Sequence, residues 1–235
     1  MSFDFIKGEA TRKFKEMDPM QWPEPRSFDV DLETGLMTGT DSRYQKFLRD
    51  LGGLYADSAA FDVLAAARGD EVVYEVTDHR PNSNPGDLIT GVTRMSPGKV
   101  GDEFFMTRGH IHAAIDRPEL YFGLKGFGVM VMESPSGDTR VVEIKANTAC
   151  YVPPRWIHRS VNLGQDDFVM LFCYPADSGQ DYAIIEQSNG MKLRIVDDGA
   201  GSWRSVPNPQ YKPRTQQEVE ALLARGVAAA EGVPR

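Results

Sequence analysis

Three histidines and one glutamate are the residues of this chain whose types and spacing best suit chemistry. The set comprises His110, His112, Glu119 and His158, and it takes three of the four histidines in the sequence. His110 and His112 are two positions apart, so on a β-strand their side chains would point to the same face. Imidazole and carboxylate ligands together suit a borderline divalent ion such as zinc, iron, nickel or manganese. The set therefore predicts a metal site.

Other polar residues have plainer interpretations. A His-x-His pair alone is more often structural than metal-binding, and it is the addition of Glu119 and His158 that favours a metal here. The fourth histidine, His79, lies just before a Pro-Asn turn signal and is interpreted as a loop residue. A solvated strand edge is the interpretation for the acidic residues Glu71, Glu75 and Asp78.

Short segments rich in β-branched and aromatic residues fill the chain between residue 71 and about residue 196. Turn residues separate them, and no helical pattern lies between them. This texture is typical of an all-β barrel or sandwich, and we expect a double-sheet jelly roll that holds a ligand between its sheets. The expected strands cover residues 71–77, 121–125, 129–133, 140–145, 148–152, 159–163, 168–174 and 182–186.

Both ends of the chain differ from this β-rich middle. Prolines interrupt residues 1–40, where we expect an extension or arm. Apolar residues at helical spacing predict a short helix over residues 41–50. A second helix is expected from Ser58, a capping residue, through Ala67.

The C-terminal segment carries its own helix signal. Thr215 and Glu218 form a capping-box pattern in front of an apolar run. We therefore expect a terminal helix over roughly residues 215–230.

The composition excludes several classes of function. With 41% hydrophobic and 26% charged residues, the chain is typical of a soluble protein. Its net charge of −8 argues against binding to nucleic acid or to acidic membranes. No apolar run approaches the roughly 20 residues needed to cross a bilayer, and the N-terminus has no signal-peptide pattern. We expect a cytoplasmic protein with a small-molecule partner, and an anionic partner would need local donors.

The sequence around the metal set resembles the two-part signature of the cupins. The first part of that signature supplies two histidines and a glutamate, and the second part supplies one more histidine. Here Pro153 precedes His158 by five residues and Asn162 follows it by four, as in the second part. Arg155 stands where the general motif prefers glycine, and the gap between His112 and the glutamate is long, so we expect a subgroup.

The subgroup that the chain resembles is the cupin-type glucose-6-phosphate isomerase family, best known from archaea and found in some bacteria. The resemblance covers roughly residues 28–196. It is carried by the runs at residues 31–35, 97–101, 103–105, 107–110, 116–117, 151–154, 156, 158–159 and 174–177.

This resemblance implies an all-β cupin jelly-roll barrel with short N-terminal helices, an arm and a C-terminal helix. The expected organisation is an N-terminal extension over 1–40, a cupin domain over 41–200 with its core at 71–196, and a C-terminal helical tail over 201–235. A homodimer is also implied, because small cupins commonly pair and the arm could embrace a partner.

The resemblance further implies an activity, the metal-dependent interconversion of glucose 6-phosphate and fructose 6-phosphate through a cis-enediol(ate), as in glycolysis and gluconeogenesis. By similarity, one divalent ion (Fe, Mn, Ni or Zn) would be held by His110, His112, Glu119 and His158. Glu119 is expected to act as the catalytic base, with Tyr174 as a second catalytic residue. The residues expected to bind the sugar phosphate are Tyr74, Thr93, Thr107, Gly109 and Tyr121.

The sequence also leaves alternatives open. Gln180 stands where the archaeal pattern carries a histidine, and an amide cannot shuttle a proton as imidazole does. A metal-assisted hydride shift would remove the need for a base. Another metal-dependent cupin enzyme, such as a dioxygenase, and a non-catalytic sugar-phosphate-binding cupin are the competing functions. A transcription regulator is disfavoured, because the chain is acidic and has no helix-turn-helix pattern.

Overall fold

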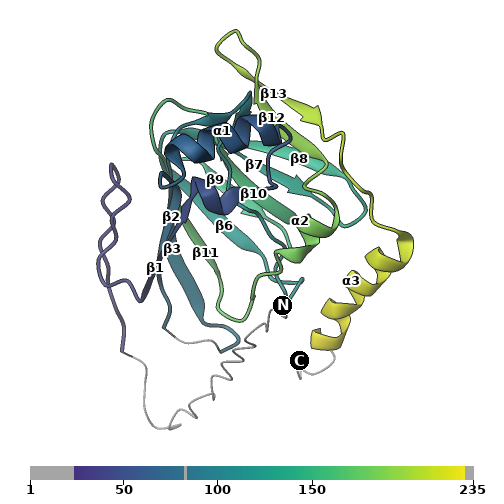
Figure 1. Cartoon of the computed structure of the whole chain (residues 1–235). Helices are drawn as coiled ribbons and strands as arrows, with labels where there is room; N and C mark the ends of the chain where they lie inside the picture. Colours follow the sequence, from purple (N-terminus) through teal and green to yellow (C-terminus); the bar gives the residue numbers. More distant parts are fainter. Residues whose placement is uncertain (1–23, 82–83, 231–235) are drawn as a thin grey trace, which may run out of the picture.

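Three antiparallel sheets make up most of the molecule (Figure 1), a computed structural model that describes residues 24–81 and 84–230. The predicted N-terminal arm falls largely on residues 1–23, which lie outside the described residues. Among the described helices, none is long and apolar enough to cross a membrane.

The largest sheet has six strands in the order β1-β2-β3-β11-β6-β9. They are β1 (Ser42–Phe47), β2 (Val72–His79), β3 (Leu88–Met95), β11 (Phe168–Pro175), β6 (Glu119–Lys125) and β9 (Ala149–Val152). The long strand β11 lies between β3 and β6, and its register aligns Tyr174 with Ile89 and Phe172 with Tyr121. Alternating side chains of these strands therefore form rows across one face of the sheet.

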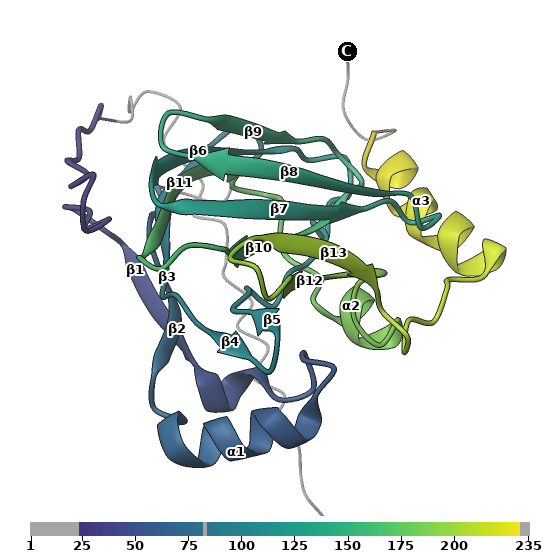
Figure 2. The same ribbon diagram turned by 90° about the horizontal axis from the view of Figure 1, so that it is seen from above.

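Two smaller sheets complete the barrel. One has the order β10-β7-β8 and the other the order β13-β12-β5-β4. Figure 2 shows β7 and β8 lying beside β6 and β9, so that the sheets enclose one continuous hydrophobic core. This architecture confirms the predicted all-β jelly roll of the cupin type. Their strands are β4 (Lys99–Val100), β5 (Glu103–Phe104), β7 (Phe127–Glu133), β8 (Thr139–Lys145), β10 (Ile157–Asn162), β12 (Leu193–Asp197) and β13 (Trp203–Pro207).

The helices are few and lie outside the sheets. They are the 3-10 helix η1 (Leu48–Leu51), α1 (Ser58–Arg68), α2 (Ala183–Gln187) and α3 (Gln216–Ala230). Figures 1 and 2 place α1 and α3 on different sides of the barrel. The expected helices at 58–67 and 215–230 are confirmed. The predicted capping box is present, since Thr215 N donates to Glu218 Oε2 at 2.7 Å and Glu218 N donates to Thr215 Oγ1 at 3.3 Å.

Two predicted elements are wrong. Residues 42–47 form β1 rather than a helix, because their backbone pairs with β2 from Ser42 opposite Asp78 onward, and only Leu48–Leu51 is helical. Residues 183–187 form α2 rather than a strand. The Asp181 carboxylate accepts a hydrogen bond from the Ala183 amide at 3.0 Å, which forms a turn just before the helix.

Several strands were not predicted from the sequence, namely β3, β4, β5, β12 and β13. The hairpin of β12 and β13 pairs across residue 200. The division of the chain at residues 40 and 200 stays a prediction.

Candidate metal centre

The three histidines and the glutamate converge inside the barrel. One ligand atom from each of the four residues lies within 4.8 Å of the others, and all four residues are buried or nearly so. Glu119 begins β6, and His158 lies in β10. His110 pairs with His158 through an isolated antiparallel bridge, in which each backbone N–H donates to the other's carbonyl, at 3.1 and 2.9 Å. The backbone thus brings two distant parts of the sequence to one point.

Gly109 allows the chain to approach this point. Its φ is +73°, a left-handed conformation that glycine adopts without strain. A Cβ at this position would lie 2.9 Å from the Arg159 Cβ and 2.9 Å from the His158 carbonyl oxygen. A side chain here would therefore push His110 away from its bridge with β10.

Backbone carbonyls fix the orientation of two imidazoles. His112 Nδ1 lies 2.8 Å from the Arg117 carbonyl oxygen, and His158 Nδ1 lies 3.1 Å from the Trp156 carbonyl oxygen. A carbonyl oxygen only accepts, so each Nδ1 carries a proton and Nε2 is the ring nitrogen left to face a metal ion. Histidines that bind metals are commonly held in this way.

The two Nε2 atoms face one carboxylate. Those of His112 and His158 lie 3.2 and 3.1 Å from Glu119 Oε2. Two imidazole nitrogens and a carboxylate oxygen that converge in this way are an arrangement suited to binding one cation. His110 Nε2 is 3.9 Å from the same oxygen and has no hydrogen-bond partner in residues 24–81 and 84–230. The donor set and the orphaned Nε2 both fit a divalent ion.

The protonation states agree with this interpretation. Burial raises the pKa of the Glu119 carboxyl, but the imidazoles of His112 and His158 lower that pKa by more, so Glu119 is ionised. Burial lowers the pKa of His110 well below its usual value, and the neighbouring His158 adds to the shift. His110 is therefore neutral near pH 7, as a metal ligand must be.

A pocket opens beside the metal centre. Its wall includes all six residues that were predicted to contact substrate, which are Tyr74, Thr93, Thr107, Gly109, Tyr121 and Tyr174. His110 and Glu119 also line it, so the metal centre and the pocket form one cavity. Ring centroids of His112 and Tyr174 lie 5.6 Å apart, which places a phenol beside the ligands.

The pocket tyrosines are neutral hydrogen-bonding groups. Burial raises the pKa of Tyr74 to about 12, that of Tyr174 to about 12, and that of Tyr121 well above its usual value. Each phenol therefore keeps its proton at neutral pH and can donate to an oxygen of a bound ligand.

Sequence reasoning missed several pocket residues. The cavity is also lined by Tyr44 of β1, Ser160 of β10 and Asp78 of β2, and by Arg80, which follows the last residue of β2. Tyr182 lines it as well, and its hydroxyl is bonded to Gln180 Oε1. These positions are far apart in the sequence, and the pairing of strands and the loops beside them bring them to one cavity.

Three of the plainer interpretations are wrong. His79 ends β2 and lies 2.9 Å from Asp41 through its Nδ1, so it is not a loop residue. Glu75 is 5% exposed and Asp78 is 0% exposed, so neither lies on a solvated strand edge. Their charges are instead paired with arginines, Arg43 and Arg80.

The backbone conformation explains the position at which this chain departs from the general cupin motif. Arg155 has a φ of +70°, in the left-handed region that favours glycine. Its amide donates to the Ile115 carbonyl at 2.7 Å, which ties the turn before β10 to the loop before β6. The motif's preference for glycine at this site follows from the same backbone conformation.

Comparison with known proteins decides the family. A family model described as Glucose-6-phosphate isomerase (GPI) matches residues 45–212, which is more than half of the chain. The chain belongs to the glucose-6-phosphate isomerase family. This confirms the family resemblance and the prediction that the chain is an enzyme of that family. The matched span contains every metal-ligand and pocket residue predicted from the sequence, and it ends before α3.

Relatives in the isomerase family come from bacteria and archaea. A "Putative glucose-6-phosphate isomerase 1" of Rhizobium meliloti is 58% identical over 202 residues, covering 86% of this chain and 94% of the relative. A "Glucose-6-phosphate isomerase" of Thermococcus kodakarensis is 41% identical over 193 residues, covering 82% of this chain and 100% of the relative.

Among solved structures, a Bacillus subtilis oxalate decarboxylase is similar at 20% identity with a TM-score of 0.37. The match covers 46% of this chain and 27% of that protein.

Proposed function

We propose that this protein is a metal-dependent aldose–ketose isomerase that interconverts glucose 6-phosphate and fructose 6-phosphate. The observation that carries the proposal is one cavity, in a chain of this family, where His110 and Glu119 of the four-residue metal cluster lie beside six hydroxyl- and amide-bearing residues. The substrate has a carbonyl and hydroxyl pair at one end and a phosphate at the other, so it needs both kinds of group.

The residues that would hold the metal are His110, His112, Glu119 and His158, and the ion would be Fe, Mn, Ni or Zn. When bound, such an ion polarises the two substrate oxygens between which the carbonyl moves. The surrounding protein keeps the site dry, since His112, Glu119 and His158 are each no more than 3% exposed. A dry site strengthens electrostatic stabilisation of the enediolate.

Glu119 is the proposed base. The imidazoles approach its Oε2, and Oε1 carries no hydrogen bond to any of them. One carboxylate can therefore use Oε2 toward the metal centre and Oε1 toward the proton that moves between C1 and C2. Tyr174 is the proposed second catalytic residue, because its neutral phenol lies against His112 and can donate to an oxygen of the substrate.

The phosphate is proposed to bind around the turn at residues 107–109. The Gly109 amide donates to no acceptor within the described part of the chain. Thr107 Oγ1 accepts from the Ser160 amide at 3.0 Å, which leaves the hydroxyl proton free to donate outward. A free amide at a positive-φ glycine is a donor that an anion can approach closely. The Thr93 hydroxyl lines the same cavity.

A coupled isomerase assay on metal-stripped and metal-reloaded protein tests the proposal. We expect conversion of fructose 6-phosphate with the reloaded protein and little with the stripped one. The variant His158→Ala should lose metal affinity and activity together, whereas His79→Ala, at a histidine outside the cavity, should keep both. Full activity in the double variant His110→Ala/His158→Ala would contradict the metal assignment.

Running the reaction in deuterium oxide tests the role of Glu119. Transfer through a carboxylate exchanges the proton with solvent, so deuterium should enter the product at the carbon that receives it. Complete retention of the substrate hydrogen would instead identify a hydride shift. Oxygen uptake with an aromatic or thiol substrate would favour a dioxygenase, and saturable sugar-phosphate binding without turnover would favour a binding protein. The homodimer also stays a prediction, which a monomeric mass in solution would overturn.

A further inference from the structure

An ion pair in the pocket wall has no part in the function proposed so far. Arg80 donates to Asp78 through two bonds, Nε to Oδ1 and Nη2 to Oδ2, both at 2.7 Å. Both residues line the cavity, and the Asp78 carboxylate is completely buried. The Arg80 side chain is 39% exposed, so only the carboxylate of the pair is buried. A buried charge is costly unless it is paired, and the guanidinium that pairs it lies in the cavity wall. This arrangement suits a role in binding the ligand.

The alternation of side chains along β2 directs Asp78 and Arg80 toward the cavity. Tyr74, Val76 and Asp78 alternate along β2 and all line the pocket, and Arg80 continues the same alternation past the strand's end. Opposite Asp78 on β3 stands Gly91. A Cβ on Gly91 would lie 2.7 Å from the Asp78 Cβ and 2.5 Å from the Phe172 ring, so glycine leaves the room that the inward carboxylate needs.

Asp78 holds one edge of the guanidinium and leaves the other edge available. Its Oδ1 also accepts from Ser42 Oγ at 2.8 Å, which further fixes the carboxylate. The remaining bond of Arg80 is Nη2 to the Tyr174 hydroxyl at 3.4 Å. Within residues 24–81 and 84–230, Nη1 of Arg80 donates to no acceptor. An oriented fork with a free edge matches the oxygens of a phosphate.

Arg80 is the one lysine or arginine among the described residues that line this cavity. Other nearby arginines are engaged elsewhere: Arg108 Nη2 donates to Glu186 at 2.7 Å, and Arg117 donates to Asp177 through two bonds at 2.7 and 3.0 Å. The whole chain carries a net charge of −8, so its general field does not favour an anion. A phosphate with about two negative charges near neutral pH needs a local cation.

The position of Arg80 also suits a long substrate. Continuing the register places Glu119, Tyr174, Ile89 and Arg80 in one row across β6, β11, β3 and β2. Three strand spacings separate the ends of that row, roughly 14 Å between backbones. The Tyr174 hydroxyl lies 3.4 Å from Arg80 Nη2, and the Tyr174 ring lies 5.6 Å from that of His112, so one ligand in the cavity can contact both the metal centre and the guanidinium.

We propose that Arg80, oriented by Asp78, donates from Nη1 to the phosphate of the bound sugar phosphate and so selects phosphorylated over neutral sugars. This inference rests on the proposed function, because it assumes that a sugar phosphate occupies the cavity. It adds a charged donor to the neutral hydroxyls and amides at residues 93 and 107–109.

Variants at Arg80 test the proposal. Arg80→Gln removes the cation, and Asp78→Asn/Arg80→Gln removes both charges, so that the double variant leaves no unpaired buried carboxylate if the single one fails to fold. The matched control is Arg43→Gln, which breaks a comparable pair with Glu75 outside the cavity. Losing one charge-assisted hydrogen bond should raise KM for fructose 6-phosphate about ten- to one-hundredfold. We expect kcat to change far less, and the control to match the wild type.

Binding of glucitol 6-phosphate, which has no carbonyl and cannot isomerise, separates this inference from the proposed function. By calorimetry its affinity should fall by the same factor in both Arg80 variants, and inhibition by inorganic phosphate should weaken in parallel. If wild-type protein binds glucitol 6-phosphate but turns over no substrate, the isomerase proposal fails, and this inference stands when both Arg80 variants lose that affinity. If turnover is normal and both variants keep the wild-type KM and glucitol 6-phosphate affinity, this inference is overturned alone.

Discussion

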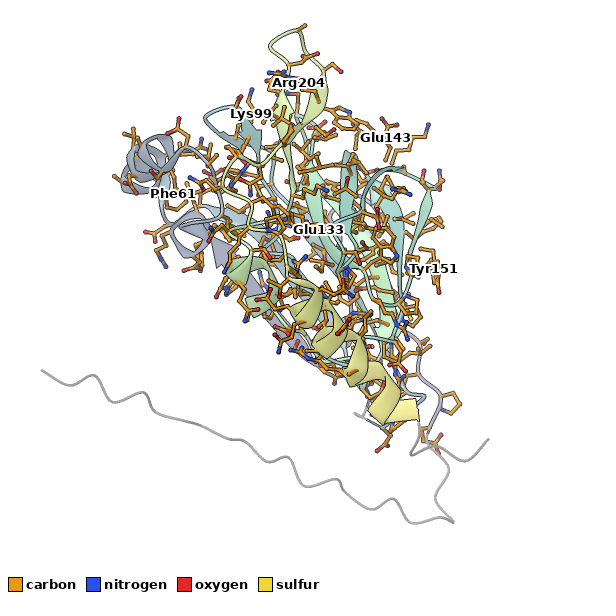
Figure 3. All side chains as sticks on the ribbon, turned by 90° about the vertical axis from the view of Figure 1, so that its right-hand side faces the viewer. Phe61, Lys99, Glu133, Glu143, Tyr151 and Arg204 are labelled. Carbon is orange, nitrogen blue, oxygen red and sulfur yellow. The ribbon has the colours of Figure 1, made fainter. Side chains whose placement is uncertain are left out.

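Removal of Arg214 should destabilise the protein far more than a typical surface change. Glu133, at the end of β7, is 0% exposed, and its carboxylate accepts from Arg214 Nη1 at 2.7 Å, Tyr211 Oη at 2.8 Å and the Lys192 amide at 2.7 Å. Figure 3 shows Glu133 in the interior of the side-chain packing, whereas Tyr151 lies at the periphery. The Arg214 side chain is only 6% exposed. It thus ties the segment before α3 to the barrel.

The magnitude follows from what Arg214→Met leaves behind. A carboxylate would remain buried with its charge unpaired, which typically costs about 3–5 kcal/mol. For a chain of 150–250 residues, about 1 kcal/mol shifts Tm by roughly 2–4 °C, so the expected loss is roughly 6–20 °C. Adding Glu133→Gln removes the unpaired charge, and the double variant should recover much of the loss. The matched control is Arg204→Met, at an exposed arginine of β13, which should stay within about 0.5 kcal/mol of the wild type.

Calorimetry on the metal-loaded protein, with urea unfolding at fixed metal concentration, measures these differences. The reasoning fails if Arg214→Met costs under about 1 kcal/mol, since the carboxylate would then be satisfied by its other two donors or by water. It fails equally if the double variant is no more stable than the single one, because the cost would then come from lost packing and not from the unpaired charge.

Three further predictions concern metal, pH and packing. Chelation should lower the Tm of the wild type by an amount that grows with the metal concentration removed, and it should leave His158→Ala unaffected. The hydrogen bonds from Arg117 lower the pKa of Asp177, so this residue stabilises the fold above its unfolded pKa of about 3.9 and loses that contribution as pH falls below it. Urea unfolding of metal-free Asp177→Asn should therefore depend less on pH between about 5 and 3 than that of the wild type. Gly128→Ala should cost about 1–3 kcal/mol or more, because its Cβ would lie 2.3 Å from the Phe168 ring and 2.4 Å from the Val161 carbonyl oxygen, whereas Gly52→Ala, whose nearest contact would be 3.5 Å, should cost less.

The metal ligands could be predicted from the sequence because they occur in short, recognisable segments. His110 and His112 share one segment, and His158 follows a proline turn that sets its direction. Only imidazole, thiolate and carboxylate serve as ligands for such an ion, so few residue types had to be considered. The strands from β6 through β11 were predicted for a similar reason, since β-branched runs between turn residues admit few other readings.

The two wrongly predicted elements have local sequence patterns that are compatible with both a helix and a strand. Phe47, Leu48 and Leu51 are at helical spacing, yet the backbone before them pairs with β2, and tertiary pairing outweighs a weak local preference. The isoleucines of α2, Ile184 and Ile185, favour a strand by composition. Both side chains are buried and pack against the core from the helix, as they would from a strand. Strand β3 was missed because Gly91 interrupts its β-branched run.

Arg80 shows why the charged part of the pocket could not be predicted. In the sequence it stands beside Pro81 in what reads as a loop, two residues after an aspartate that reads as solvated. Its place in the cavity depends on the β2–β3 register, which aligns Asp78 with Gly91, and on β11, which brings the Tyr174 hydroxyl within 3.4 Å. A register shift of one residue would turn the same arginine to the outer face. A sequence motif therefore predicts the metal ligands, whereas the residues that would determine substrate specificity can be identified only when the strand pairing is known.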